Sequence, residues 1–396
     1  MLLNVMTLTT CGARRARRAG WGLLLAAALA ACSPAGPARP TPARPPVTER
    51  TPTKVPATLR LGVVVPAGGA DYMQQYSDAV VEGVKVAAEE RSAGDDYRVE
   101  LVVRSFTTPA EAAAAVRELS GAGVLGIVGP LLDATVATAA AARTDTAVVI
   151  VSPTATSSFR DLPNVYALNA PDTLGASALG EYVVRAGLTP LAVLRPRSGA
   201  ALAHARAFQG AVTRRSGAAP LELSFEPGTT NYSAVLRRLR DARVKAVFVA
   251  AEESDLRQLL PQLGYYGLGG AQVLATGPWA TPDGLDRIGL RALDGVITTL
   301  PFLPSDSAGT WRHFARQYEL LNRRSLDSAV PALGYDAAAL LLSNPAGGAA
   351  QLANRLRAGG EVTGATGHLV PLRGSVGRRP VLVRVSAEQL VRVLAP

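Results

Sequence analysis

Leu125-Gly126-Ile127-Val128-Gly129-Pro130 begins the stretch that decides the fold, and a helical pattern from Asp133 to Arg143 follows it. The stretch continues as Ala147-Val148-Val149-Ile150-Val151 and ends in Ser152-Pro153-Thr154-Ala155-Thr156-Ser157-Ser158. Two short apolar runs, each followed by a turn of Gly, Pro, Ser or Thr, are typical of adjacent strands in a parallel α/β sheet. Such sheets bind small molecules beyond the carboxyl ends of their strands. The same turns are also ordinary helix N-caps, so alone they do not establish a site.

Strand and helix patterns alternate on both sides of this stretch. Strands are predicted over 59–65 and 98–104 before it, and over 191–194, 221–225, 245–250 and 272–275 after it, with helices between them. This alternation predicts an α/β fold of two Rossmann-like doubly wound lobes joined by a hinge. The expected domains are a signal peptide over 1–31, a Pro-rich tether over 32–57, lobe one over 58–170 and 300–372, and lobe two over 171–299 and 373–396.

The N-terminus has the pattern of a lipoprotein signal. An Arg-rich segment precedes an apolar run from Trp21 to Ala31, which is too short to span a bilayer. The run ends in Leu29-Ala30-Ala31-Cys32, which resembles a bacterial lipobox, and we expect Cys32 to carry the lipid. The Pro-rich segment that follows cannot bury a core and is expected to act as a semi-rigid tether. The expected location is the cell envelope, outside the cytoplasm and anchored to a membrane by lipid.

The net charge of +10 is concentrated before the predicted fold. Much of the excess lies in the leader and tether, at Arg14, Arg15, Arg17, Arg18, Arg39, Arg44, Arg50 and Lys54. The arginines of the later segments are interspersed with acids and form no basic stripe with aromatics, so we expect no nucleic-acid partner.

Catalysis, cofactors and metals find no support in the sequence. Cys11 and Cys32 are the only cysteines, and both precede the predicted fold, which excludes a disulfide within it. His204, His313 and His368 are far apart, so we expect no structural metal. The chain lacks the G-x-S-x-G, P-loop and H-E-x-x-H patterns. We therefore expect no enzyme activity and no cofactor.

The order of segments resembles the type I periplasmic solute-binding proteins, specifically the leucine/isoleucine/valine-binding receptors of ABC transporters. The residues that carry the resemblance are Leu61-Gly62-Val63-Val64-Val65-Pro66, the helix with Gly83, Gly126-Ile127-Val128-Gly129-Pro130, Ser152-Pro153-Thr154-Ala155-Thr156-Ser157 and Gly334-Tyr335-Asp336-Ala337. The resemblance implies that a small polar solute, such as an amino acid, binds between the lobes and is presented to an ABC permease.

The resemblance also implies a set of ligand-binding residues. These lie in the turns after the predicted strands and are Asp133, Ser152, Thr154, Thr156, Ser198, Glu252 and Trp279. Asp133 departs from the family pattern, because the family offers a hydroxyl to the ligand carboxylate there and an acid would repel it. Glu252 could pair with a ligand ammonium or remain a solvated carboxylate near a helix N-terminus. Trp279 could close over a ligand or pack between the lobes.

A second resemblance leads to a different function. Gly129-Pro130-Leu131-Leu132, Leu260-Pro261-Gln262-Leu263-Gly264-Tyr265-Tyr266-Gly267 and Ala332-Leu333-Gly334-Tyr335-Asp336 are similar to segments of the penicillin-binding-protein activator lipoproteins. That family has the same fold, and the resemblance implies a cell-wall synthase as partner. Both alternatives stay open at the level of sequence.

Overall fold

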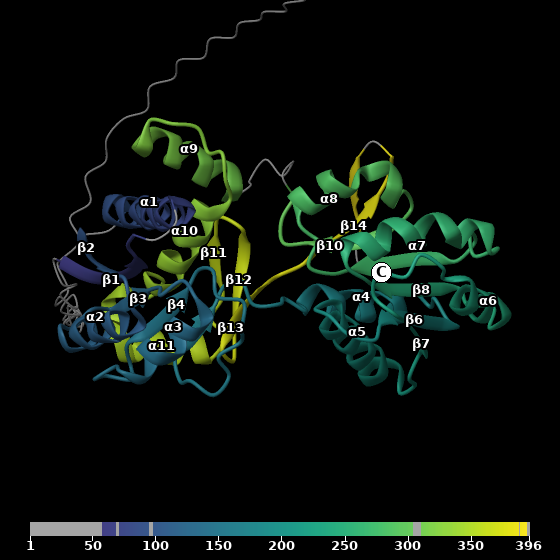
Figure 1. The fold of residues 1–396 in the computed structure, drawn as a ribbon, viewed down its shortest axis with the longest axis horizontal. Coiled ribbons are helices and arrows are strands. Elements are labelled where there is room, and N and C mark those ends of the chain that lie inside the picture. Colours follow the sequence, from purple (N-terminus) through teal and green to yellow (C-terminus); the bar gives the residue numbers. More distant parts are fainter. Residues whose placement is uncertain (1–57, 69–70, 95–97, 304–309, 388, 394–396) are drawn as a thin grey trace, which may run out of the picture. The chain divides into compact units, whose positions relative to one another are not determined.

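The computed structural model describes residues 58–68, 71–94, 98–303, 310–387 and 389–393. These residues form two β-sheets, each covered by helices (Figure 1). The predicted signal peptide, the Pro-rich tether and Cys32 lie outside the described residues. Within the described residues, no helix has the length and apolar character needed to cross a membrane.

The first sheet and its helices form lobe one. Its strand order is β11-β12-β13-β5-β4-β3-β1-β2, and the strands from β13 to β2 are paired in parallel. The strands are β1 (Thr58–Pro66), β2 (Arg98–Phe106), β3 (Gly126–Val128), β4 (Val149–Ser152), β5 (Val165–Ala167), β11 (Val362–Gly364), β12 (Gly367–Leu372) and β13 (Ser375–Arg378). The central strands are apolar on both sides because helices cover both faces.

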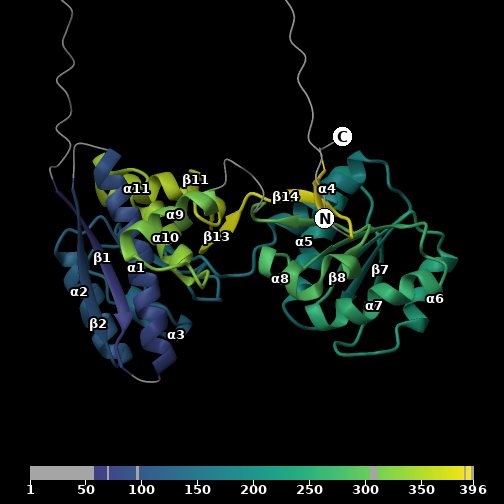
Figure 2. The same ribbon diagram turned by 90° about the horizontal axis from the view of Figure 1, so that it is seen from above.

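Each face of this sheet carries its own hydrophobic core. One core packs the sheet against α1 (Asp71–Gly94), α10 (Val330–Leu341) and α11 (Gly348–Arg357). The other core packs it against α2 (Pro109–Gly121) and α3 (Asp133–Ala141). Phe314 and Tyr318 of α9 (Thr310–Asn322) add an outer layer over α1 and α10. Figure 2 shows the same helices from above.

Helices α1 and α10 touch through their backbones, although they are far apart in the sequence. A Cβ atom on Gly83 would lie 1.7 Å from the carbonyl oxygen of Pro331, and a Cβ atom on Gly334 would lie 2.2 Å from that of Val80. No side chain fits at either position, which gives both glycines a packing role.

The second sheet and its helices form lobe two. Its strand order is β15-β14-β10-β9-β8-β6-β7. The strands are β6 (Leu191–Pro196), β7 (Leu221–Phe225), β8 (Ala246–Ala250), β9 (Gln272–Thr276), β10 (Ile297–Leu300), β14 (Val381–Val385) and β15 (Leu390–Arg392). One face packs against α4 (Leu174–Arg185) and α5 (Ala201–Ser216). The other packs against α6 (Ser233–Asp241), α7 (Glu253–Tyr265) and α8 (Pro282–Ile288).

The strand order takes the chain between the sheets three times, and the second passage includes residues 304–309, which lie outside the described residues. The chain leaves the first sheet after β5, returns after β10, and leaves again between β13 and β14. The last passage follows Arg378, because β13 still pairs with β12 and β5. The boundary expected near Arg373 therefore falls in the turn between β12 and β13. The chain enters lobe two again through β14, which pairs antiparallel with β10.

Some elements differ from the sequence-based expectation. The helix predicted to run from Asp133 to Arg143 ends at Ala141. Helices α8 and α11, the short 3-10 helices η1 (Leu290–Leu293) and η2 (Pro345–Gly347), and the antiparallel strands β11 to β13 had no counterpart in the expected elements. The antiparallel strands are short and contain Gly and Pro, so their periodicity is weak.

Candidate functional site

The turns after β3 and β4 are tied together at the carboxyl end of the first sheet. The Ser152 hydroxyl is fully buried and donates to the carbonyl oxygen of Pro130 at 2.6 Å. The Thr154 hydroxyl donates to the carbonyl oxygen of Leu131 at 2.7 Å. Both hydroxyl protons are therefore used within the protein. The Ser152 oxygen also accepts the Ala155 amide at 3.2 Å, so of these two hydroxyls only that of Thr154 can act as an acceptor toward a ligand.

Asp133 holds the end of the second turn. Its carboxylate accepts the Thr156 and Ser157 amides at 2.9 Å each and the Thr156 hydroxyl at 2.8 Å. Burial by itself raises the pKa of Asp133, but the hydrogen bonds from Ser157 and Thr156 outweigh it and hold the pKa below its ordinary value. Asp133 is therefore ionised at neutral pH. The structure brings together Asp133, Ser152, Thr154 and Thr156.

Gly129 allows the turn after β3 to pack against β1. Its φ is +91°, a left-handed conformation that favours glycine. A Cβ atom at this position would lie 2.1 Å from the carbonyl oxygen of Val64 in β1. The turn thus has the close approach to the neighbouring strand that only glycine permits.

In lobe two, Glu252 lies between two turns. One carboxylate oxygen accepts the Ala201 amide at 3.0 Å and so caps the N-terminus of α5. The same oxygen is 3.7 Å from the position of a Cβ atom on Gly199. Glu252 thus reaches the turn after β6, where Ser198 is exposed. Strands β6 and β8 are adjacent in the sheet, so these two predicted residues share its carboxyl edge.

Trp279 belongs to the core of lobe two. Its side chain is 3% exposed, and its indole Nε1 donates to the carbonyl oxygen of Ala251 at 3.0 Å. A Cβ atom on Gly277 would lie 2.8 Å from the same indole nitrogen. In this structure the indole supports the backbone just before Glu252.

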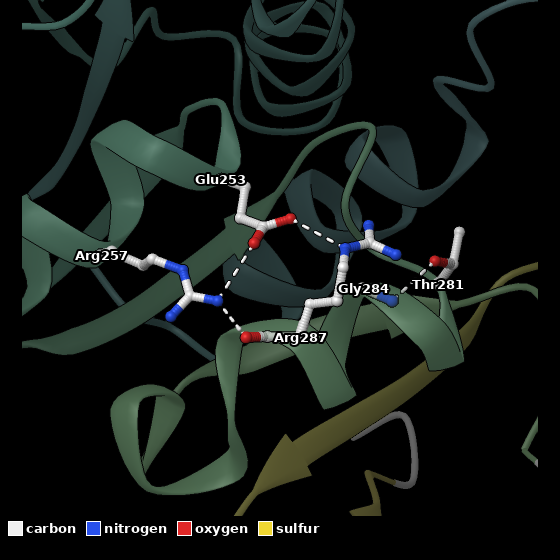
Figure 3. A network of polar contacts seen from close by, with 5 residues as sticks. All are labelled: Glu253, Arg257, Thr281, Gly284 and Arg287. Atoms are coloured by element: carbon white, nitrogen blue, oxygen red, sulfur yellow. Dashed lines mark hydrogen bonds and ion pairs between the residues drawn. The ribbon is translucent and has the colours of Figure 1, made fainter.

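The residue after Glu252 takes part in an ionic network that the sequence analysis missed. Glu253 pairs with Arg257 at 3.1 Å and with Arg287 at 3.3 Å, and the Arg257 guanidinium also donates to the Arg287 carbonyl oxygen (Figure 3). The network ties the first turn of α7 to α8. The i, i+4 spacing of Glu253 and Arg257 is a signal that could have predicted one of these pairs. Nothing local points to Arg287.

A second missed residue is Asp255, whose side chain is 1% exposed. One of its carboxylate oxygens accepts the Gly228 amide at 2.8 Å and the Tyr232 hydroxyl at 3.2 Å. Asp255 therefore fixes the turn between β7 and α6 from within α7. The sequence does not show that Asp255 is buried, because Glu252 and Glu253 are acids close to it in the chain.

The described residues also contain a cavity of about 390 Å³ in lobe one. It lies between α1, α10, α11 and β11, and its lining includes Glu90, Arg91, Tyr335 and Arg355. None of the seven predicted ligand-binding residues lines it. Among the residues the structure describes, no cluster of His, Cys, Asp and Glu side chains has the arrangement of a metal site.

Comparison with known proteins identifies relatives with this architecture. The chain is 24% identical over 237 residues to Leu/Ile/Val-binding protein homolog 3 of Brucella melitensis, a match that covers 57% of this chain and 64% of that protein. The match thus spans less than two thirds of that relative.

Solved structures show the same fold. One, described as a candidate branched-chain amino acid ABC transporter from Rhodospirillum rubrum, has a TM-score of 0.72 and 21% identity, and the match covers 85% of this chain and all of that one. An ABC transporter substrate-binding protein from Desulfitobacterium hafniense, complexed with Leu, has a TM-score of 0.54, 19% identity and the same coverage. A solute-binding protein from R. palustris, complexed with 4-hydroxybenzoate, has a TM-score of 0.52 and 18% identity, covering 85% of this chain and 95% of that one.

A sequence model of the periplasmic binding proteins matches residues 58–370, which span both sheets. This family consists of solute-binding receptors and points to a location outside the cytoplasm. The two-lobed α/β fold agrees with the architecture of the solved relatives. The chain therefore belongs to the periplasmic binding protein family.

Proposed function

We propose that the protein is a lipid-anchored receptor that binds a small polar solute, an amino acid or a related molecule, between its lobes and delivers it to an ABC permease. The family membership supports a receptor role. The Brucella relative is a Leu/Ile/Val-binding protein homolog, and the Desulfitobacterium structure contains Leu, which supports an amino-acid-like solute. Cys32 supplies the anchor in this proposal.

The charge of the predicted site indicates which kind of solute to expect. Its ionisable residues, Asp133 and Glu252, are both carboxylates. The hydroxyls of Thr154 and Thr156 donate inward, so in this arrangement they offer a ligand acceptors instead of protons. Burying a ligand carboxylate beside these acids, without a cationic group on the ligand, would cost several kcal/mol. We therefore expect a zwitterionic or cationic solute.

Thermal-shift and calorimetric screening against neutral amino acids, basic amino acids, short peptides and amides tests the proposal. Saturation at about 100 times the dissociation constant stabilises a protein by about 2.7 kcal/mol, which such assays detect. If every solute in the panel leaves the melting temperature unchanged, the receptor proposal is wrong.

Asp133→Ser tests the role of the charge. Restoring a hydroxyl at this position is expected to tighten binding of a neutral amino acid and to weaken binding of a cationic one. A change of about 1.4 kcal/mol corresponds to a factor of ten in the dissociation constant. Asp133→Asn is the matched control, since it removes the charge and keeps a carbonyl acceptor for the Thr156 and Ser157 amides. Equal shifts for both solutes would show that Asp133 acts only on the loop.

A second candidate function is regulation of a cell-wall synthase, as in the penicillin-binding-protein activators. One observation favours it: most of the predicted ligand-binding side chains already bond to the chain itself, namely Asp133, Ser152, Thr154, Thr156, Glu252 and Trp279. Crosslinking in intact envelopes followed by purification separates the two functions. Recovery of a permease without a synthase would exclude the regulatory role.

A further inference from the structure

A fully buried carboxylate organises the turn between β11 and β12. Asp336, in α10, accepts the Ala365 amide at 2.5 Å and the Thr366 amide at 3.3 Å, and it also accepts the Thr366 hydroxyl. These bonds compensate a carboxylate that has no contact with water. Asp336 and Thr366 are 30 residues apart in the sequence. The position of the turn is thus set by a side chain from α10.

Arg378 extends this network to the first and third passages between the sheets. Its Nε donates to the Thr366 hydroxyl oxygen at 2.7 Å, and its Nη1 donates to the carbonyl oxygen of Leu168 at 3.1 Å. Its backbone amide donates to Asp172 at 2.7 Å, and Asp172 also accepts the Leu174 amide at 3.0 Å. Leu168 and Asp172 lie just after β5, on the first passage, and Arg378 is the last residue before the third.

The second passage touches the same turn. Gly367 has a φ of +117°, and a Cβ atom there would lie 2.5 Å from the carbonyl oxygen of Pro301, which follows β10. On the far side of this passage, the Thr310 hydroxyl donates to the carbonyl oxygen of Ala365 at 3.3 Å. All three passages therefore contact the turn at 365–367 or a residue bonded to it.

We propose that Asp336, Thr366, Arg378 and Asp172, here called the crossing cluster, are positioning residues that restrict how the two lobes can move relative to each other. The strand order makes these three passages the covalent links between the sheets, and the contacts described above involve only described residues on either side of 304–309. Arg378 bonds the first passage to the third, and Gly367 lies against the second. The three passages therefore move together. Among the described residues, no hydrogen bond joins the cluster to any of the seven predicted ligand-binding residues, so its effect on binding is indirect. The inference extends the proposed function only in linking this movement to solute capture.

Thr366→Val is the most direct test, because it keeps the shape of the side chain and removes the hydroxyl that joins Asp336 to Arg378. The readout is the distance distribution between spin labels at Ala110→Cys in lobe one and Ser216→Cys in lobe two, both exposed positions. The full chain also carries Cys11→Ser and Cys32→Ser so that only these labels react. No solute is added, so failure of the receptor proposal does not affect the result.

We expect Thr366→Val to widen the distance distribution about twofold, and Thr366→Ser, which keeps the hydroxyl, to restore the wild-type width. Val116→Ala is the control for general destabilisation, because Val116 is fully buried in α2 and lies outside the crossing cluster. It should leave the width unchanged. A wild-type width for Thr366→Val, or equal widening by Val116→Ala, would overturn the proposal.

Arg378→Gln provides a second test should circular dichroism show that Thr366→Val does not fold. Its matched control is Arg379→Gln, because the neighbouring Arg379 pairs with Glu361 within lobe one. We expect about twofold widening for Arg378→Gln and none for Arg379→Gln. If the two variants give the same distribution, the crossing cluster does not restrict the lobes.

Discussion

We expect His204 to make the stability of the protein depend on pH. The residue lies on α5, which packs against α4, and its side chain is 4% exposed. Its Nδ1 atom is buried and has no hydrogen-bond partner among the described residues. Burial lowers the pKa of His204 from 6.5 to about 4, because the charged imidazolium is poorly solvated there.

The sign and size of the effect follow from this shift. Between pH 6.5 and 4 the unfolded chain binds a proton at His204 and the folded protein does not, so stability falls as the pH is lowered through this range. Lowering the pKa of His204 from 6.5 to about 4 corresponds to about 3 kcal/mol of unfolding free energy, of which about 2.5 kcal/mol is lost at pH 4.5. Above pH 6.5 neither the folded nor the unfolded state binds a proton at His204, so this loss of stability is absent.

Urea denaturation at pH 7.5 and pH 4.5, followed by circular dichroism, measures this loss. The variant His204→Leu cannot bind the proton, so its free energy of unfolding should fall less between the two pH values than that of the wild type, by about 2.5 kcal/mol. His368→Gln is the control for removal of a histidine, since His368 is exposed and belongs to β12 of lobe one. Parallel pH profiles for the wild type and His204→Leu would refute the reasoning.

Three further outcomes are expected. Gly129→Ala should destabilise the protein by about 3 kcal/mol or more in thermal denaturation, because its Cβ would collide with the Val64 carbonyl at an unfavourable φ; an unchanged melting temperature would contradict the geometry. Glu252→Ala should cost about 1 kcal/mol through loss of the α5 cap, while Glu252→Gln keeps an acceptor and should cost less; equal costs would show that the cap is not the cause. Cys32→Ser should move the protein from the detergent phase to the aqueous phase in detergent partitioning of whole cells, and a protein that stays in the detergent phase would exclude Cys32 as the lipid site.

Most of the parallel strands of both sheets could be predicted from sequence, because these strands are short apolar runs followed by their own turn and helix. The segment from 362 to 378 could not, since its strands are short and contain Gly and Pro, although β11, β12 and β13 pair with one another as neighbours in the sequence. Only the pairing of β13 with Ala167 of β5 joins this segment to a distant strand. Helix α8 has only seven residues, too few for a clear helical period. Local patterns thus predict the strands that carry a clear apolar run and miss the short elements whose pattern is weak.

The candidate site could also be predicted only in part. The positions of Asp133, Ser152 and Thr154 at the ends of β3 and β4 follow from the order of strands. The partners of their side chains do not, because each bonds to a residue more than 20 positions away, as the Ser152 bond to Pro130 illustrates. Sequence alone therefore places these groups at the correct edge of the sheet without showing that the hydroxyl protons are already used.

The path of the chain through lobe one has a consequence for its biosynthesis. Strand β1 begins at Thr58, whereas β13, which completes the parallel part of the same sheet, ends at Arg378. Helix α10, which contacts α1 through Gly83 and Gly334, is also contributed by the last third of the chain. During synthesis or export, the apolar face of the N-terminal half of this lobe stays uncovered until nearly the whole chain is available. A chain that is released early would expose this surface. We therefore expect chaperones that hold exported proteins unfolded to bind this chain for longer than they bind a protein whose domains are contiguous.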